Sequence, residues 1–246
     1  MTVALNNRIA LVTGASRGIG AATALALARA GAHVVAVART VGGLEELDDA
    51  IRSASGSATL VPLDMADFSG LARLAGALNE RYGHLDILVG NAALVGPSSP
   101  LDHITLQDWD EVMKVNVTAN WQLICAMDAL LRRSDAGRAV FLTSGAAHNM
   151  RPYRGLYSTS KAALEAVVRT YAAETERTAV RVNLFNPGPT RTRMRAQVMP
   201  GEDPMTLPPP EEVAEKIVEL CVPRFSETGR LYDFRSRKLM AFRKPE

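Results

Sequence analysis

The stretch Arg8-Ile-Ala-Leu-Val-Thr-Gly-Ala-Ser-Arg-Gly-Ile-Gly20 decides the fold class of this 246-residue chain. Its apolar run predicts a buried strand over residues 8–12, and glycines at positions 14, 18 and 20 follow directly. The apolar periodicity continues from Ile19 to Ala30, which predicts a helix that Gly31 ends. A strand, a glycine-rich turn and a helix in this order present backbone N–H groups to a phosphate at the helix N-terminus. The segment therefore predicts a nucleotide-binding unit.

Short apolar runs alternate with amphipathic helical stretches along the rest of the chain. Further strands are predicted over residues 34–38, 59–61, 87–89, 139–142, 180–185 and 231–234. Further helices are predicted over residues 44–53, 68–82, 106–131, 157–176 and 210–220. Strands that are apolar on both faces and alternate with helices favour a parallel sheet covered on both sides. We therefore predict an α/β chain with a doubly wound parallel sheet of about seven strands, flanked by helices on both faces.

Residues 1–246 are predicted to form a single domain, because no linker rich in glycine, serine or proline divides the chain. Residues 188–209 are one long irregular stretch that contains several prolines. Long loops inside compact domains commonly serve function. We predict that this stretch is an insertion that acts as a substrate loop or lid.

The composition argues against several classes of protein. The net charge of +2 is too close to neutral for a nucleic-acid binder. The first residues lack the pattern of a signal peptide, and the apolar stretch 23–38 is too short and interrupted to cross a bilayer. Cys125 and Cys221 are predicted to be buried free thiols, and no Cys/His cluster suggests a metal. We expect a cytoplasmic protein with no bound metal and no nucleic-acid or membrane partner.

The end of the second predicted strand bears on the choice of nucleotide. A carboxylate at this place would accept a hydrogen bond from a ribose 2′-hydroxyl and favour NAD(H). This chain instead has Ala38 followed by Arg39, and Arg17 lies inside the glycine-rich turn. Two guanidinium groups suit a 2′-phosphate, which predicts NADP(H) rather than NAD(H). The alternative, that both arginines are merely solvated, stays open at this point.

A tyrosine and a lysine, Tyr157 and Lys161, are spaced to share one face of a helix. An ammonium group near a phenol stabilises the phenolate, so we predict that Lys161 lowers the pKa of Tyr157. Such a tyrosine exchanges a proton with a carbonyl or hydroxyl oxygen near neutral pH. Together with the phosphate-binding turn, this pair predicts hydride chemistry on a nicotinamide cofactor.

In combination, the motifs resemble those of the short-chain dehydrogenases/reductases, over nearly the whole chain from Ile9 to about Phe234. The motifs are Thr13-Gly14-x3-Gly18-x-Gly20, Asp64, Asn91-Ala92, Asn116, Ser144, Tyr157-x3-Lys161 and Asn186-Pro187-Gly188. Residues 187–195, followed by 202–204, also resemble a bacterial subgroup of undefined substrate. The resemblance implies a Rossmann-like fold and dimers or tetramers, which we expect to form through the helices at 106–131 and 157–176.

The resemblance also implies a role for each matching residue. Tyr157 would be the general acid/base, Ser144 would hold the substrate oxygen, Lys161 would also bind the nicotinamide ribose, and Asn116 would order a water for proton relay. Thr13, Gly14, Ser16, Arg17, Gly18, Ile19 and Gly20 would form the phosphate-binding turn, and Arg39 the 2′-phosphate site. Asp64 and Met65 would cap the adenine, Asn91 and Ala92 would lie under the adenosine, and Thr190 and Thr192 would hold the nicotinamide carboxamide. Pro187 and Gly188 would also bind the cofactor.

The chain departs from the family pattern at three places. Ala93 stands where the family usually has glycine, and Gly90 stands where relatives often have asparagine. The C-terminus lacks the family's usual ending and carries Arg235, Arg237, Lys238, Arg243 and Lys244. The tail therefore leaves its local fold and any role in assembly undetermined from the sequence.

These observations predict an NADP(H)-dependent oxidoreductase that interconverts a carbonyl and a hydroxyl group, with an undefined small-molecule substrate. Leu94, Val95, residues 146–153 and the 188–209 loop are expected to form the substrate wall. The arginines of that loop are expected to stay in water, and the alternative is that they steer an anionic group. One alternative is a 3-oxoacyl thioester reductase whose arginines receive a phosphopantetheine. Another is a non-catalytic regulator that senses NADP(H). His148 also remains a candidate for substrate contact.

Overall fold

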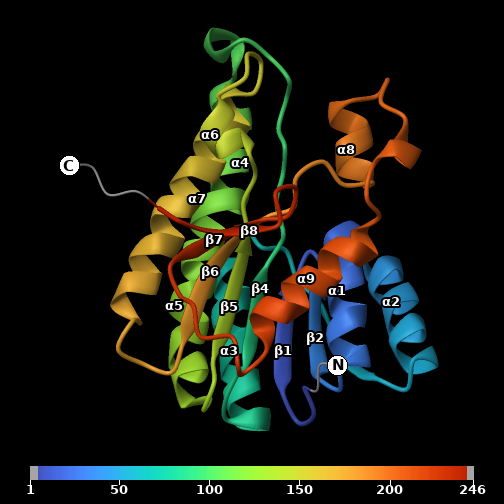
Figure 1. Cartoon of the computed structure of the whole chain (residues 1–246), viewed down its shortest axis with the longest axis vertical. Coiled ribbons are helices and arrows are strands. Elements are labelled where there is room, and N and C mark those ends of the chain that lie inside the picture. The colour runs from blue at the N-terminus through green and yellow to red at the C-terminus, as the bar shows by residue number, and fades with distance from the viewer. Residues whose placement is uncertain (1–4, 243–246) are drawn as a thin grey trace.

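Eight strands pair into one sheet in the computed structural model, which describes residues 5–242 (Figure 1). They are β1 (Ile9–Thr13), β2 (His33–Ala38), β3 (Ser57–Pro62), β4 (Ile87–Gly90), β5 (Arg138–Leu142), β6 (Arg181–Asn186), β7 (Arg230–Asp233) and β8 (Lys238–Ala241). Their order is β3-β2-β1-β4-β5-β6-β7-β8, and only the last pair is antiparallel. The strand order reverses between β1 and β4, and ligands of such sheets bind at this point.

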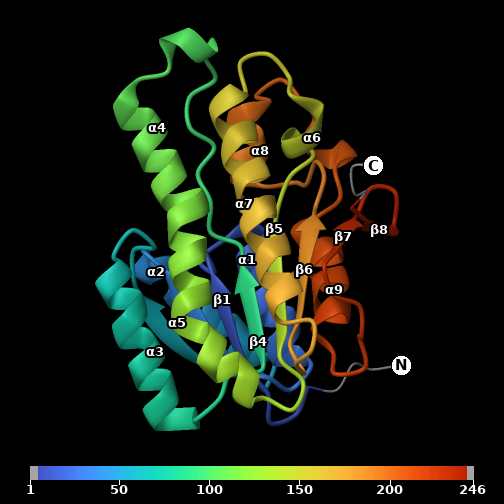
Figure 2. The same ribbon diagram turned by 90° about the vertical axis from the view of Figure 1, so that its left-hand side faces the viewer.

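Helices cover both faces of the sheet (Figures 1 and 2). They are α1 (Gly18–Arg29), α2 (Val41–Ser53), α3 (Phe68–Tyr82), α4 (Leu106–Met113), α5 (Ala119–Arg133), α6 (Ala146–Asn149), α7 (Gly155–Glu174), α8 (Arg193–Val198) and α9 (Pro210–Cys221). Shorter helical turns are η1 (Leu101–His103), the π-helical η2 (Lys114–Thr118) and η3 (Pro204–Thr206). Helices α1, α2 and α9 pack on one face, and α3, α5 and α7 pack on the other.

The central strand β1 shows why the sheet is buried on both sides. Ala10 and Val12 face the cluster formed with α1, α2 and α9, whereas Ile9 and Leu11 face the cluster formed with α3, α5 and α7. Successive side chains of a strand point to opposite faces, so an unbroken apolar run serves two cores. The predicted fold class is therefore confirmed, with an eighth strand added to the expected seven.

The predicted helix over residues 106–131 is divided in the structure. Helix α4 runs into the π-helical turn η2, and α5 continues from there. The Ala119 amide donates to the Lys114 carbonyl, and the Asn120 side-chain amide donates to the Asn116 carbonyl (2.9 Å). A single π-turn inside a helix commonly lies at a functional site. Periodicity detects the apolar face but does not reveal one extra residue in a turn.

The predicted irregular stretch 188–209 contains ordered structure of its own. The Thr192 hydroxyl caps α8 by accepting from the Arg195 amide (3.1 Å). The Arg195 guanidinium pairs with the Glu202 carboxylate (2.7 Å), and Asp203 caps η3. Figure 1 shows α8 above the ends of α1 and α2, away from the sheet. We refer to residues 188–209 as the lid segment.

Four further observations concern expectations from the sequence. Cys221 is buried as predicted, but Cys125 is exposed, because it lies on the outer side of α5. Within residues 5–242, no helix has the length and apolar character that crossing a membrane requires. The same part of the chain holds no cluster of three or more histidine, cysteine or carboxylate side chains suited to a metal. Arg243 and Lys244 of the basic tail lie outside the described residues.

Candidate active site

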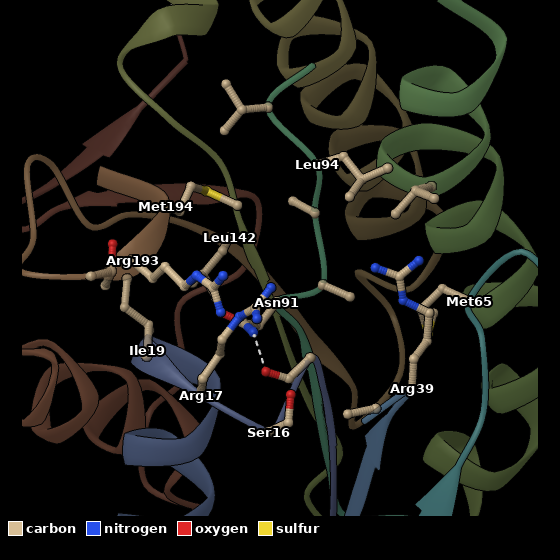
Figure 3. A pocket seen from close by; sticks show the side chains of 18 of the residues that line it. Ser16, Arg17, Ile19, Arg39, Met65, Asn91, Leu94, Leu142, Arg193 and Met194 are labelled. Carbon is tan, nitrogen blue, oxygen red and sulfur yellow. Dashed lines mark hydrogen bonds between the residues drawn. The ribbon is translucent and has the colours of Figure 1, made fainter. Parts of the chain in front are cut away.

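A cleft of about 300 Å³ opens at the carboxyl ends of the parallel strands (Figure 3). Many of the predicted cofactor residues line it: Gly14, Ser16, Arg17, Gly18, Ile19, Arg39, Asp64, Met65, Asn91, Ala92, Tyr157, Lys161, Pro187 and Thr192. The cleft therefore brings together groups from nearly the whole length of the chain.

The glycine-rich turn is shaped by close backbone contacts. Gly14 has φ +66°, which favours glycine, and a Cβ on Gly20 would lie 2.2 Å from the Gly14 carbonyl oxygen. The Asn91 side-chain amide donates to the Thr13 carbonyl (2.9 Å), and the Thr13 hydroxyl accepts from the Asn91 amide (3.0 Å). Thr13 and Gly20 therefore shape the cleft from beneath its surface, and Asn91 joins the ends of β1 and β4.

The N-terminus of α1 faces this cleft. Its N-cap residue is Arg17, whose side chain does not cap the helix. The first backbone N–H groups of a helix have no partner within it, and together with the helix dipole they attract an anion. The start of α1 is therefore suited to a phosphate group.

Three arginines extend the positive character of the cleft. Arg17, Arg39 and Arg193 all line it, and Figure 3 shows their side chains directed into it. The Arg39 guanidinium lies 3.7 Å from the Asp64 carboxylate, and both side chains are about half exposed. Arg193 is exposed, as expected for the arginines of the lid segment, and it also lines the cleft.

Tyr157 and Lys161 lie one turn apart on α7 and both line the cleft. The predicted lowering of the Tyr157 pKa is wrong for the protein by itself. Burial raises the pKa of Tyr157 to about 12, while the Ser144 hydroxyl and the charge of Arg154 act in the opposite direction. Removing the phenol from water disfavours the phenolate. This effect on the Tyr157 pKa is larger than the opposite effects of Ser144 and Arg154.

Lys161 is buried, whereas Tyr157 is only half-buried. Its ammonium group donates to the Leu142 carbonyl (2.8 Å) and lies 5.8 Å from the centroid of the Tyr157 ring. Burial lowers the pKa of Lys161 to about 8, and the nearby Glu165 carboxylate opposes this shift. The ammonium group is thus held by the end of β5 and lies beside the tyrosine ring.

Ser144 and Asn116 approach the same region from other elements. Ser144 follows β5, where its hydroxyl accepts from the Ala146 amide (3.2 Å) and lies close enough to Tyr157 to affect the tyrosine pKa. The Asn116 amide donates to the Leu94 carbonyl (2.8 Å) and the Ser160 hydroxyl (2.9 Å), and its oxygen accepts from the Leu94 amide (2.8 Å). The Asn116 side chain therefore holds the Leu94 wall of the cleft, and its expected role in ordering a water stays a prediction.

Only some of the residues expected at the nicotinamide line the cleft, and the others lie behind its surface. Pro187 and Thr192 line the cleft, but Thr190 is buried and its hydroxyl donates to the Pro187 carbonyl (3.3 Å). Gly188 has φ +64°, and its amide donates to the Asn186 side-chain oxygen (3.2 Å). That oxygen also accepts from the Gly145 amide (3.1 Å), so Asn186 links the Ser144 segment to the turn after β6.

Several residues of the cleft were missed from the sequence. They are Thr40, Leu63, Val115, Leu142 and Thr143, whereas Arg193 and Gln197 belong to the 188–209 loop that was predicted to form part of the wall. Thr40 and Leu63 lie next to the predicted Arg39 and Asp64. They could have been predicted, because ligands of such sheets bind at the carboxyl ends of the strands. Val115 lies in the π-turn, and Gln197 and Arg193 lie on α8, where only the folded lid segment shows which side faces inward.

Comparison with known proteins finds similarity to short-chain dehydrogenases over most of the chain. Residues 8–203 match the model of the short chain dehydrogenase family. The uncharacterized oxidoreductase YciK of Escherichia coli is 38% identical over 212 residues, covering 85% of this chain and 84% of the relative. A short chain dehydrogenase structure from Pseudomonas syringae superimposes with a TM-score of 0.91 at 38% identity, covering 95% of this chain and 96% of that one.

A third relative is a solved short chain dehydrogenase from Shigella flexneri, which is complexed with NADP. It superimposes with a TM-score of 0.89 at 35% identity, covering 95% of this chain and 99% of that chain. The family match, the shared fold and the arrangement of the cleft agree. The chain belongs to the short-chain dehydrogenase family.

Proposed function

We propose that this protein is an NADP(H)-dependent oxidoreductase that interconverts a carbonyl and a hydroxyl group. The observation that carries the proposal is that the phosphate-binding turn, the arginines and the Tyr157–Lys161 pair line one cleft. The NADP complex of the Shigella flexneri relative supports the choice of cofactor. We propose Thr13, Gly14, Ser16, Arg17, Gly18, Ile19, Gly20, Arg39, Asp64, Met65, Asn91, Ala92, Pro187, Gly188, Thr190 and Thr192 as the residues that form the cofactor site, with Tyr157 and Lys161.

The geometry of the turn fits this cofactor. A Cβ at Gly14 or Gly20 would meet the Asn91 side-chain amide at 2.8 or 2.5 Å, so only glycines leave the backbone free to approach a diphosphate. The uncapped N-terminus of α1 suits that diphosphate, and Arg39 suits a 2′-phosphate. When bound, NADPH supplies the hydride.

Tyr157 is proposed to handle the proton. Because the pKa of Tyr157 is about 12, the phenol is protonated at neutral pH and is ready to donate to a carbonyl oxygen as the alcohol forms. The Lys161 ammonium stabilises the phenolate that remains, and Ser144 donates a hydrogen bond to the same substrate oxygen. These roles favour reduction of a carbonyl as the direction of the reaction.

The arrangement favours turnover over sensing. A regulator that only binds NADP(H) has no use for a buried phenol beside a buried ammonium group. Both groups cost folding free energy when removed from water. Their retention at the cleft therefore supports an enzyme of undefined substrate, whose apolar wall includes Leu94, Val95, Val115 and Met194.

A panel assay tests the proposed function. The purified protein is mixed with NADPH or NADH and with ketones, 1,2-diketones, quinones or 3-oxoacyl thioesters, and cofactor oxidation is followed by absorbance. We expect turnover with NADPH for at least one carbonyl class and weaker use of NADH. Tight NADPH binding without turnover on any class would favour the regulator instead. Selective turnover of the thioesters would favour the thioester reductase.

We also propose that the protein assembles as a homodimer or homotetramer. Leu106 on α4 and Trp121 on α5 are large apolar side chains that are 74% and 50% exposed. Pairing of the α4–α5 surface across a two-fold axis would bury them. Size-exclusion chromatography with light scattering tests this, and a mass of 26.5 kDa at micromolar concentration would refute it.

A further inference from the structure

A buried carboxylate lies next to the proposed proton-transfer centre. Glu165 is on α7, one helical turn beyond Lys161, and only 5% of its surface is exposed. Its Oε1 accepts a hydrogen bond from the Thr143 hydroxyl (2.6 Å) and lies 3.1 Å from His148 Nε2. Carboxylates are rarely buried unless they are paired or hydrogen-bonded, and this one has partners of both kinds.

The two partners of Glu165 lie on either side of Ser144 in the chain. Thr143 directly precedes Ser144 at the end of β5, and His148 lies on α6. Both contacts end on one oxygen of a side chain that α7 supplies, and α7 also carries Tyr157. The segment 143–148 is therefore tied at two points to α7, the helix of the proposed proton donor.

The charge of Glu165 also acts on Lys161. Burial lowers the pKa of the Lys161 ammonium to about 8, and Glu165 is the charged neighbour that counters this loss. The titratable groups that face Glu165 are Lys161 on its own helix and His148 on α6. The His148 side chain is half exposed, so it connects this buried group to solvent.

We propose that Glu165 is a positioning residue for the reaction: its carboxylate keeps the positive charge on Lys161 and fixes the segment that carries Ser144. The proposal rests on the proposed function, because that function assigns the roles of Lys161 and Ser144. Glu165 itself does not touch substrate or cofactor in this proposal. It acts through Lys161 on one side and through Thr143 on the other.

The effect on charge is measured on the protein without cofactor. The Lys161 pKa is measured by NMR of the protein labelled with [¹³Cε]lysine. The spectrum is simple because the protein contains few other lysines (Lys114, Lys216, Lys238 and Lys244). The signal is assigned with Lys161→Met. Glu165→Gln keeps the shape and a hydrogen-bond acceptor but removes the charge, so the Lys161 pKa is expected to fall by about one unit. Glu174→Gln, the same change at an exposed position of α7, is expected to leave it unchanged.

The effect on position is measured with a second variant. Thr143→Val removes the hydrogen bond to Glu165 but keeps the carboxylate, so the Lys161 pKa is expected to stay at its wild-type value. Its kcat with NADPH is expected to fall about tenfold or more, because Ser144 is displaced. Thr143→Val thus also tests the proposal if Glu165→Gln does not fold.

Two results would overturn the proposal: an unchanged Lys161 pKa in a folded Glu165→Gln protein, or an unchanged kcat in Thr143→Val. If the proposed function itself is wrong, the result differs from these two. In that case the wild-type protein has no turnover with any carbonyl class, whereas the Lys161 titration still reports the charge effect.

Discussion

Gly90 leaves the space that the Phe141 ring needs in the core. A Cβ at this position would lie 2.3 Å from the Phe141 ring and 2.9 Å from the Asn120 side-chain oxygen. The Phe141 ring therefore occupies the space that a side chain at position 90, such as asparagine, would need. The neighbouring departure, Ala93, lacks a positive φ, so its methyl group adds no backbone strain.

Gly90→Ala is expected to destabilise the fold by about 1–3 kcal/mol, because the added methyl group forces the Phe141 ring or the strand to move. Urea unfolding of the two proteins measures the difference. Gly76→Ala on α3 is the control without a clash, since a Cβ there meets no atom within 4 Å, and it is expected to raise stability because alanine favours a helix over glycine. Equal stability of Gly90→Ala and the wild type would contradict the packing argument.

Arg39 is the residue on which the cofactor preference is expected to depend most. Arg39→Ala removes a guanidinium from the end of β2, and a hydrogen bond to a charged group contributes about 1.5–3 kcal/mol. The dissociation constant of NADPH is therefore expected to rise by about tenfold or more, while that of NADH changes little. Fluorescence titration measures both, and parallel losses for NADH and NADPH would show that Arg39 does not contact the 2′-phosphate.

Residue spacing predicted which groups share the cleft but not their protonation. The step from Tyr157 to Lys161 gives a common helix face, and that part of the prediction agrees with the structure. The sign of the Tyr157 pKa shift was wrong because burial is a property of the folded surroundings, which the spacing does not contain. The same reason explains Cys125, which sits in an apolar pattern yet is exposed.

Among the elements, the lid segment holds three arginines whose different surroundings could not be predicted from the sequence. Arg191, Arg193 and Arg195 alternate along the chain, but they have different surroundings. Arg195 pairs with Glu202, Arg191 contacts the Met205 sulfur, and Arg193 lines the cleft with Arg17. Helix α8 separates these surroundings, and nothing in a basic, proline-rich stretch predicted this short helix.

Arg193→Ala is expected to weaken NADPH binding about fivefold, because an exposed cation near a phosphate contributes about 1 kcal/mol. Arg191→Ala removes the same charge from the side of the lid that does not line the cleft, and it is expected to bind NADPH as the wild type does. Titrations at low and high salt add a second check, since the Arg193 effect is expected to shrink as salt screens the charge. Equal affinity of both variants would mean that α8 does not approach the cofactor.

Long periodic elements were predicted well, and short ones were not. The strands of the parallel sheet and helices α3 and α9 follow from apolar periodicity and from end signals such as Gly83, which has φ +74°. Strand β8 was missed because all its residues are exposed and it has no apolar alternation toward a core. It pairs with β7 only because the chain reverses there.

At the scale of the whole molecule, the proposed site reduces stability. The pKa of Lys161 is lowered from 10.5 to about 8, so the unfolded chain binds its proton more tightly between these values. This shift corresponds to about 3 kcal/mol of stability that is lost below pH 8 and recovered as the pH rises toward 10.5.

Lys161→Met lacks this titration. The stability of the wild type relative to Lys161→Met is therefore expected to increase by about 3 kcal/mol between pH 8 and pH 10.5. Urea unfolding of both proteins across this range measures the change. A constant difference between them would mean that Lys161 titrates normally and is not buried as a charge.

Proton donation by Tyr157 in an NADPH-dependent reduction is tested with the variant Tyr157→Phe. This change removes one hydroxyl from the cleft and keeps the ring. We expect kcat with the best carbonyl substrate to fall by about 10²–10⁴-fold while the NADPH dissociation constant stays near that of the wild type. A Tyr157→Phe protein that turns over at the wild-type rate would contradict the claim.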